Sequence, residues 1–185
     1  MSRRPSAMAP EDPASVARLN AVGILTRREI EARILAPVLD ALGGEFGRER
    51  VIAVAREAIA GVAREQGRAM AEASGDTSLP AFFAQWEPWT RGGALELTVI
   101  EATDTSLAFD VTRCRYAEMY RALGLADLGE VLSCQRDGAL VGGYAPDVAF
   151  TRTQTLMQGA PCCDFRYTRT APDATPESGP SGATR

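Results

Sequence analysis

The chain has 185 residues, of which 45% are hydrophobic and 24% charged, and this composition is typical of one globular domain with a full core. The formal net charge is −4, so no basic field favours nucleic acid as a partner. The sequence has no histidine, and all 20 basic residues are arginine, which excludes serine–histidine and cysteine–histidine catalysis, imidazole metal sites and lysine Schiff bases.

The lack of a recognisable targeting segment and the small number of cysteines bear on the compartment in which the protein works. No apolar run reaches the roughly 18–20 residues of a membrane span, and the first fifteen residues lack the apolar segment of a secretory signal. We therefore expect a cytoplasmic protein that binds a small molecule, with no membrane partner and with a homo-oligomer possible. In a reducing compartment, four cysteines indicate reactivity, metal binding or packing rather than a disulfide scaffold.

Composition also divides the chain. Residues 1–13 and 171–185 are rich in Pro, Ser, Gly and Thr and bury little, so we predict disordered tails there. Residues 14–170 are predicted to form a single α+β domain. No internal repeat divides this segment further.

The N-terminal half has helical periodicity. A capping box at Thr26–Glu29 predicts a helix start, Pro37 predicts a kink or a division, and Gly43-Gly44 predicts the end. Large aliphatic residues recur every four positions and are predicted to face the core, namely Ile30, Ile34, Val38 and Leu42, with Leu35 and Leu39 beside them. A second helix is predicted over residues 48–73. A short helix from Pro80 leads to Trp86 and Trp89, which either roof a pocket as a lid or pack in the ordinary way.

Near residue 94 the spacing of hydrophobic residues changes from the helical period to strict alternation, which is a period of two residues. Alternation over residues 95–99 and 107–111, with a turn at 104–105, predicts a β-hairpin. Two helices are predicted next, from Cys114 to Gly124 and from Asp127 to Leu140, followed by strands over 148–156 and 164–168. The predicted fold is α+β: a helical N-terminal half packed on an antiparallel sheet of about four strands, with two helices inserted between the strand pairs.

All four cysteines lie between Phe109 and Tyr167. Cys114 follows a predicted strand and starts a predicted helix, where backbone N–H groups favour a thiolate and lower its pKa. The plainer interpretation is a small buried hydrophobe. Cys162 and Cys163 are adjacent at the start of a predicted strand, so at most one of them points into a given site.

Cys134 and Asp137 are three residues apart on a predicted helix, so their side chains share a face. A carboxyl beside a thiol can carry a proton during attack and collapse, and desolvation would raise its pKa toward neutrality. The alternatives are a bound ion, or a surface aspartate and a core cysteine. Three arginines, Arg113, Arg152 and Arg166, are candidates for binding a substrate carboxylate, although surface arginine is the commoner explanation for each.

Four motifs in order resemble a known family. They are VTRCRYAEMY at 111–120, CQRD at 134–137, RTQT at 152–155 and GAPCCDF at 159–165, and together they resemble the L-2-amino-thiazoline-4-carboxylic acid hydrolase family over most of the chain. The cysteine before Asp-Phe recurs in that family, so the resemblance favours Cys163 over Cys162. It implies a hydrolase of a non-peptide C–N bond in a small cyclic amidine or isothiourea carboxylic acid.

We hypothesise that Cys134 or Cys163 is the nucleophile and that Asp137 carries the proton, with Cys114 as a further thiol in the site and no cofactor. One alternative is a zinc site of three sulfurs and one oxygen, formed by Cys114, Cys134, Asp137 and Cys163. A second is a small-molecule-binding or sensor domain with a structural zinc, whose large closed apolar cavity would lie far from the thiols. A third is four unreactive core cysteines.

Overall fold

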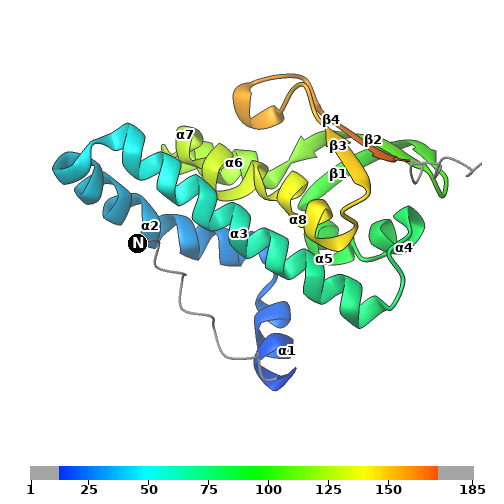
Figure 1. Cartoon of the computed structure of the whole chain (residues 1–185). Coiled ribbons are helices and arrows are strands. Elements are labelled where there is room, and N and C mark those ends of the chain that lie inside the picture. Colours follow the sequence, from blue (N-terminus) through cyan, green and yellow to red (C-terminus); the bar gives the residue numbers. More distant parts are fainter. Residues whose placement is uncertain (1–12, 171–185) are drawn as a thin grey trace, which may run out of the picture.

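The computed structural model describes residues 13–170 (Figure 1), and the predicted tails lie outside the described residues, except that Pro13 begins the first helix. The N-terminal half is helical, with α1 (Pro13–Val22), α2 (Ile24–Phe46), α3 (Arg48–Ser74), α4 (Leu79–Ala84), α5 (Glu87–Thr90) and a 3-10 turn, η1 (Arg91–Gly93). No helix in this described part of the chain is long and apolar enough to cross a membrane.

A four-stranded sheet forms the second half. Its strands are β1 (Leu95–Ala102), β2 (Ser106–Cys114), β3 (Val148–Thr151) and β4 (Cys163–Arg169), in the order β1-β2-β4-β3, and every pair is antiparallel. Between β2 and β3 lie α6 (Arg115–Ala122), α7 (Ala126–Gly129), a π-helical turn, η2 (Glu130–Cys134), and α8 (Arg136–Tyr144). A 3-10 turn, η3 (Leu156–Gln158), lies between β3 and β4. The predicted α+β class is confirmed.

The boundaries of α2 differ from the prediction. Gly23, with φ of 82°, precedes the helix and no side chain caps it, so Thr26 lies inside α2 rather than at its start. The helix continues without division through Pro37 and Gly43-Gly44, and Gly47, with φ of 89°, ends it. A positive φ is accessible to glycine at little cost, and this explains why α2 begins and ends at these two glycines.

The predicted core stripe of α2 is wrong. Its four large aliphatic side chains are all exposed, Ile34 by 61%, and the others are Ile30, Val38 and Leu42. The buried face instead carries Ala32 and Ala36, together with Leu39, which lies beside the predicted stripe. Small side chains let α2 approach α3 and α6 closely, and a pattern of large residues does not reveal a face built on alanine.

Helix α8 lies between α3 and the sheet (Figure 1), and glycines make its contact with α3 possible. A Cβ atom on Gly67 of α3 would overlap the carbonyl oxygen of Leu140, and one on Gly143 of α8 would overlap the carbonyl oxygen of Arg64. The two backbones therefore touch without intervening side chains. This close packing fixes the position of α8, which carries Asp137.

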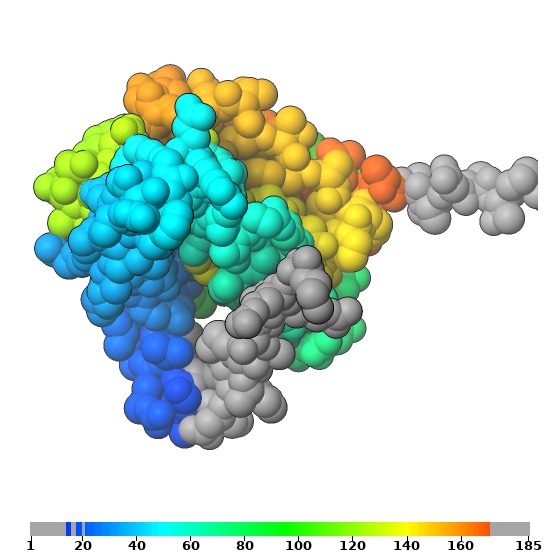
Figure 2. All heavy atoms as spheres, turned by 60° about the vertical axis from the view of Figure 1, so that its left-hand side comes forward, coloured from blue at the N-terminus to red at the C-terminus, as the bar shows by residue number. Residues whose placement is uncertain are grey.

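The other side of α8 faces an aromatic core. Phe109 of β2 and Phe165 of β4 are paired across the sheet and their rings stack with centroids 4.9 Å apart. Trp86 packs its ring edge-on against both, at 4.9 Å and 5.7 Å. Such pairs add to the burial of apolar area, and they hold the turn between α4 and α5 against the sheet. The α2–α3 hairpin, blue to cyan, forms much of the face of the molecule seen in Figure 2.

Candidate active site

A cavity of about 70 Å³ lies where these layers meet. Its wall includes Cys114, Cys134, Cys163 and Asp137, which come from the end of β2, from η2, from the start of β4 and from α8. Aromatic side chains form much of the remaining wall, namely Trp86, Trp89, Tyr116 and Phe165. Three thiols far apart in the sequence thus open onto one small space together with a carboxyl, and both tryptophans border it.

The π-helical turn places Cys134 and Asp137. The predicted continuous helix over 127–140 is instead broken into α7, η2 and α8, and the amide of Gln135 donates to the carbonyl of Glu130 at 3.0 Å, five residues back. The extra residue in the turn shifts the helical phase, so Leu132 packs in the core while Cys134 and Asp137 both reach the cavity. Single π turns of this kind are frequent at functional sites.

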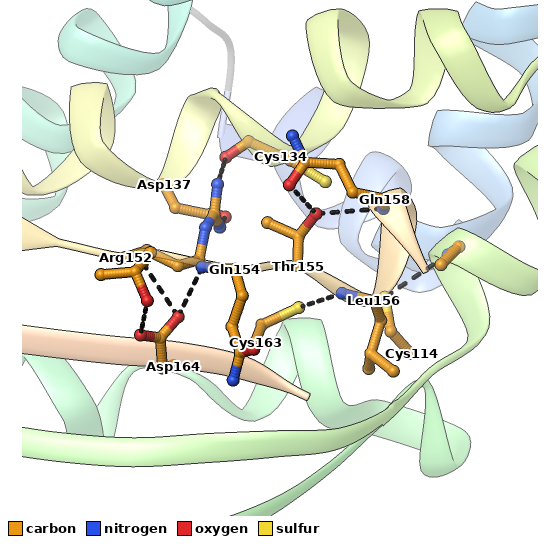
Figure 3. A network of polar contacts seen from close by, with 12 residues as sticks. Cys114, Cys134, Asp137, Arg152, Gln154, Thr155, Leu156, Gln158, Cys163 and Asp164 are labelled. Carbon is orange, nitrogen blue, oxygen red and sulfur yellow. Dashed lines mark hydrogen bonds and ion pairs between the residues drawn. The ribbon is translucent and has the colours of Figure 1, made fainter. Parts of the chain in front are cut away.

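Arg152, just after β3, joins the parts of the site (Figure 3). Its guanidinium donates to Asp137 Oδ2 at 2.6 Å and to the carbonyl oxygen of Cys134 at 2.9 Å. It also lies over the ring of Phe165, 5.0 Å from the centroid. The side chain is only 11% exposed, so this is a buried, charge-assisted contact that fixes the carboxyl relative to the sheet.

Burial raises the pKa of the Asp137 carboxyl, and the positive charge of Arg152 opposes that rise. Although 27% of the Asp137 side chain is accessible, the residue lines the cavity, so the surrounding protein still desolvates it. A carboxyl in this position can take up and release a proton closer to neutrality than an exposed aspartate can.

The three cavity thiols are all harder to ionise than a free cysteine. Burial raises the pKa of Cys114 to about 11, even though the amide of Ala117 donates to its sulfur at 3.4 Å. The predicted lowering of the Cys114 pKa by the helix start is therefore wrong, because desolvation outweighs the amide. Burial also raises the pKa of Cys134, and the nearby carboxyl of Asp137 adds to the rise.

Cys163 differs from the other two in its surroundings. Burial raises its pKa as well, but the amide of Leu156 donates to its sulfur at 3.1 Å and the charge of Arg152 also favours the thiolate (Figure 3). Its neighbour Cys162 accepts from Gln154 Nε2 at 3.1 Å and is absent from the cavity wall formed by the described residues. The adjacent cysteines thus have separate surroundings, as the strand geometry predicts.

The segment before η3 is held by Asp164 rather than by a sheet ladder. The carboxylate of Asp164 accepts from the amides of Thr153 and Gln154 at 3.0 Å and 2.9 Å, and from the hydroxyl of Thr153 at 2.6 Å. The strand predicted over 148–156 therefore ends at Thr151. These bonds bring Leu156 back to the start of β4, where its amide meets Cys163.

Two of the three predicted carboxylate-binding arginines lie elsewhere. Arg113 is exposed and pairs with Glu118 at 2.8 Å and Glu96 at 3.2 Å. Arg166 pairs with Asp110 at 2.8 Å. Neither belongs to the cavity wall formed by residues 13–170, because each is drawn to a neighbouring acid on the sheet. Of the three predicted arginines, Arg152 alone lines the cavity, and it is bonded to Asp137.

Two arginines that sequence reasoning did not single out line the cavity, Arg28 and Arg136. Arg28 is buried within α2 and pairs with Glu31 at 2.7 Å. No hydrophobic pattern predicts a buried arginine there. Arg136 lies inside the CQRD motif, between Cys134 and Asp137, and its place in that motif was the available signal.

The predicted zinc ligands do not form a metal-binding cluster among the described residues. Within the described residues, no group of three or more cysteine, aspartate and glutamate side chains is arranged to hold a metal ion. The Asp137 carboxylate, the only oxygen donor of the predicted set, is instead engaged by Arg152. All four cysteines are free thiols.

The fold and the cavity define an α+β domain with a small site of thiols, a carboxyl and guanidinium groups. The chain belongs to the L-2-amino-thiazoline-4-carboxylic acid hydrolase family, which matches over residues 27–167. The crystal structure of the phenol-responsive sensory domain of the transcription activator PoxR with phenol matches at 12% identity, covering 74% of this chain and 73% of that chain, with a TM-score of 0.47. No curated protein sequence matches the chain.

Proposed function

We propose that this protein is a hydrolase that opens the ring of a small cyclic amidine or isothiourea, such as 2-amino-thiazoline-4-carboxylate, by cleaving a non-peptide C–N bond. The family supports the reaction class. The observation that carries the proposal is that Cys163 and Asp137 line the same cavity, where Arg152 is bonded to Asp137 and its charge acts on Cys163. A chain with no histidine needs another proton carrier, and Asp137 is the buried carboxyl that borders this cavity.

The nucleophile we favour is Cys163. Because burial keeps the thiol protonated at neutral pH, attack must begin with loss of its proton, and Asp137 is the acceptor. The amide of Leu156 and the guanidinium of Arg152 stabilise the thiolate that forms. Cys134 has no hydrogen bond to its sulfur from the described residues, and the adjacent carboxylate disfavours its thiolate.

The reaction then proceeds in two halves. The thiolate adds to the carbon between nitrogen and sulfur of a ring that enters with its nitrogen protonated. Asp137 then gives the proton of Cys163 to the same ring nitrogen, and the C–N bond breaks to leave a neutral amine and an iminium carbon bonded to the ring sulfur, the exocyclic nitrogen and Cys163. Water adds to the same carbon, Asp137 takes its proton, and the Cys163 thiolate leaves and is reprotonated. The aspartate thus alternates between base and acid, which a carboxyl with a raised pKa can do near neutrality.

The alternative of a sensor domain is less well supported. It predicts a closed apolar cavity at a distance from the cysteines, whereas three thiols, a carboxyl and three arginine side chains border this one. A cavity of about 70 Å³ also restricts the ligand to a small molecule.

The identity of the product tests the reaction class. With 2-amino-thiazoline-4-carboxylate as substrate, cleavage of the ring C–N bond gives one product that carries a free primary amine and an S-carbamoyl (thiocarbamate) group. Cleavage of the ring C–S bond would instead release a free thiol. Amine and thiol reagents, combined with carbon NMR of the product, distinguish the two. Appearance of a thiol without an amine, or no turnover of any cyclic amidine, would contradict the proposal.

A further inference from the structure

Of the three arginines that line the cavity, Arg136 is the one for which the described residues supply no side-chain partner. Each of the other two is paired, Arg28 with Glu31 at 2.7 Å and Arg152 with Asp137 at 2.6 Å. Arg136 lines the same cavity but makes no side-chain hydrogen bond or ion pair with any residue in the range 13–170. A guanidinium carries five N–H donors, so this half-buried side chain leaves its whole hydrogen-bonding capacity open.

The charges around the cavity do not balance. Arg28, Arg136 and Arg152 contribute three positive charges, while Glu31 and Asp137 contribute two negative charges. With the thiols protonated, one positive charge remains, and it belongs to the unpaired Arg136. Burial and the neighbouring charge of Arg28 together lower the Arg136 pKa to about 10, although the charges of Glu31 and Asp137 oppose this shift. Keeping such a charge half-buried costs free energy unless a ligand compensates it.

The surroundings of Arg136 suit one class of ligand. The guanidinium fork matches a carboxylate, which it can bind through two parallel hydrogen bonds. Trp86, Trp89 and Phe165 offer flat apolar surface to a ring. Because Arg136 lies between Cys134 and Asp137 in the sequence and at the start of α8, an acid group bound there holds the attached ring beside the reacting groups.

We propose that Arg136 binds the carboxylate of the substrate, so that the cavity selects small planar heterocyclic acids over their neutral analogues. The proposal deepens the hydrolase function proposed above and rests on it for the identity of the ring. It assigns the role to Arg136 in place of Arg113 and Arg166, whose guanidinium groups are paired on the sheet.

A binding experiment with ligands that cannot be hydrolysed tests this assignment. Thiazole-4-carboxylate and thiazole-4-carboxamide differ only in the acid group, and both are aromatic. The protein has two tryptophans, Trp86 and Trp89, and both line the cavity, so their fluorescence reports binding. The wild-type protein should bind the carboxylate more tightly than the carboxamide. Arg136→Gln should weaken carboxylate binding by about tenfold to a hundredfold and leave carboxamide binding unchanged.

Two further variants complete the design. Arg136→Lys keeps the charge but loses the fork, so its affinity for the carboxylate should lie between those of the wild type and Arg136→Gln. Arg113→Gln removes an exposed arginine outside the cavity and should leave both affinities unchanged. Without ligand, Arg136→Gln should raise the thermal unfolding temperature, because it removes an uncompensated charge. A merely structural role of Arg136 would lower that temperature.

The outcomes separate the two proposals. Equal carboxylate affinity in wild type and Arg136→Gln, or no preference of the wild type for the carboxylate, overturns the role of Arg136. Turnover of 2-amino-thiazoline-4-carboxylate by Arg136→Gln at an unchanged KM also overturns it, while leaving the hydrolase standing. Arg136-dependent binding of the carboxylate without turnover of any cyclic amidine supports the anion site and removes the hydrolase.

Discussion

At the scale of single residues, the balance between burial and hydrogen bonding governs the chemistry of the thiols. The amides at Cys114 and Cys163 each favour a thiolate, yet desolvation outweighs them and the pKa of both groups is raised. A helix start or a strand end is therefore not enough to predict a reactive cysteine. How deeply a thiol is buried in the folded protein decides its protonation state, and the local sequence carries little information about burial.

The raised pKa values predict how alkylation depends on pH. Native protein should react slowly with iodoacetamide at pH 7, and labelling of Cys114 should rise by about tenfold per pH unit toward its pKa of about 11. Urea-unfolded protein, whose thiols have ordinary pKa values near 8.5, should instead reach a plateau at about pH 9–10. Peptide mass spectrometry assigns the labelled sites. A native plateau for Cys114 below pH 9 would show that burial does not control this thiol.

Arg136 shows what a residue-level pattern can miss. It lies in the CQRD motif between two candidate residues, but its role depends on what the fold leaves unpaired around it. Arg113 and Arg166 were equally plausible in sequence, and nearby acids on the sheet engage them. Pairing across strands is a property of register, and side-chain periodicity alone does not predict it.

At the scale of elements, the contact between α3 and α8 positions the site. Gly67 and Gly143 let the two helix backbones touch, and α8 carries Asp137 into the cavity from that contact. The π-helical turn η2 precedes α8 and sets the phase of Cys134 relative to the core residue Leu132. Close packing and a phase shift together bring a thiol and a carboxyl from one chain segment to the same cavity.

A pair of glycine substitutions in α8 tests this packing. Gly143→Ala should destabilise the protein by about 3 kcal/mol, because the added methyl group overlaps the backbone carbonyl of Arg64, which cannot move without displacing α3. Gly142→Ala, one residue earlier in the same helix, meets no neighbouring atom and should stabilise by about 0.4–1 kcal/mol. Urea unfolding of the two variants measures both effects. Equal stability of the two would mean that the helices are not in backbone contact.

At the scale of the whole molecule, the sequence was sufficient to predict the class of fold, but it did not predict which face of α2 is buried. Alternation of residue type predicted the hairpin of β1 and β2, and turn residues separated it from the helices around it. The core face of α2 could not be predicted in this way, because it is built on Ala32 and Ala36 while Ile34 and Val38 face outward. The largest side chains mark a core only where neighbouring elements leave room for them.

The cavity was partly predictable as well. The cysteines and Asp137 were identified from the sequence as candidates, the family resemblance selected Cys163 over Cys162, and four of these side chains line the cavity. The aromatic residues near Pro80 supplied part of its wall. The unpaired guanidinium and the buried Arg28 were not predictable, because both depend on how α2 and α8 face each other across the finished structure. The site is therefore a product of the assembled layers rather than of any one motif.

The most direct test of the central claim is mass spectrometry of acid-quenched protein during exposure to 2-amino-thiazoline-4-carboxylate, with Cys163→Ser and Cys162→Ser as matched variants. The account predicts an adduct on the peptide that holds Cys163, turnover lost by at least about a hundredfold in Cys163→Ser, and turnover near wild type in Cys162→Ser, whose thiol lies outside the cavity wall. Full turnover by Cys163→Ser, with no adduct on that peptide, would contradict it.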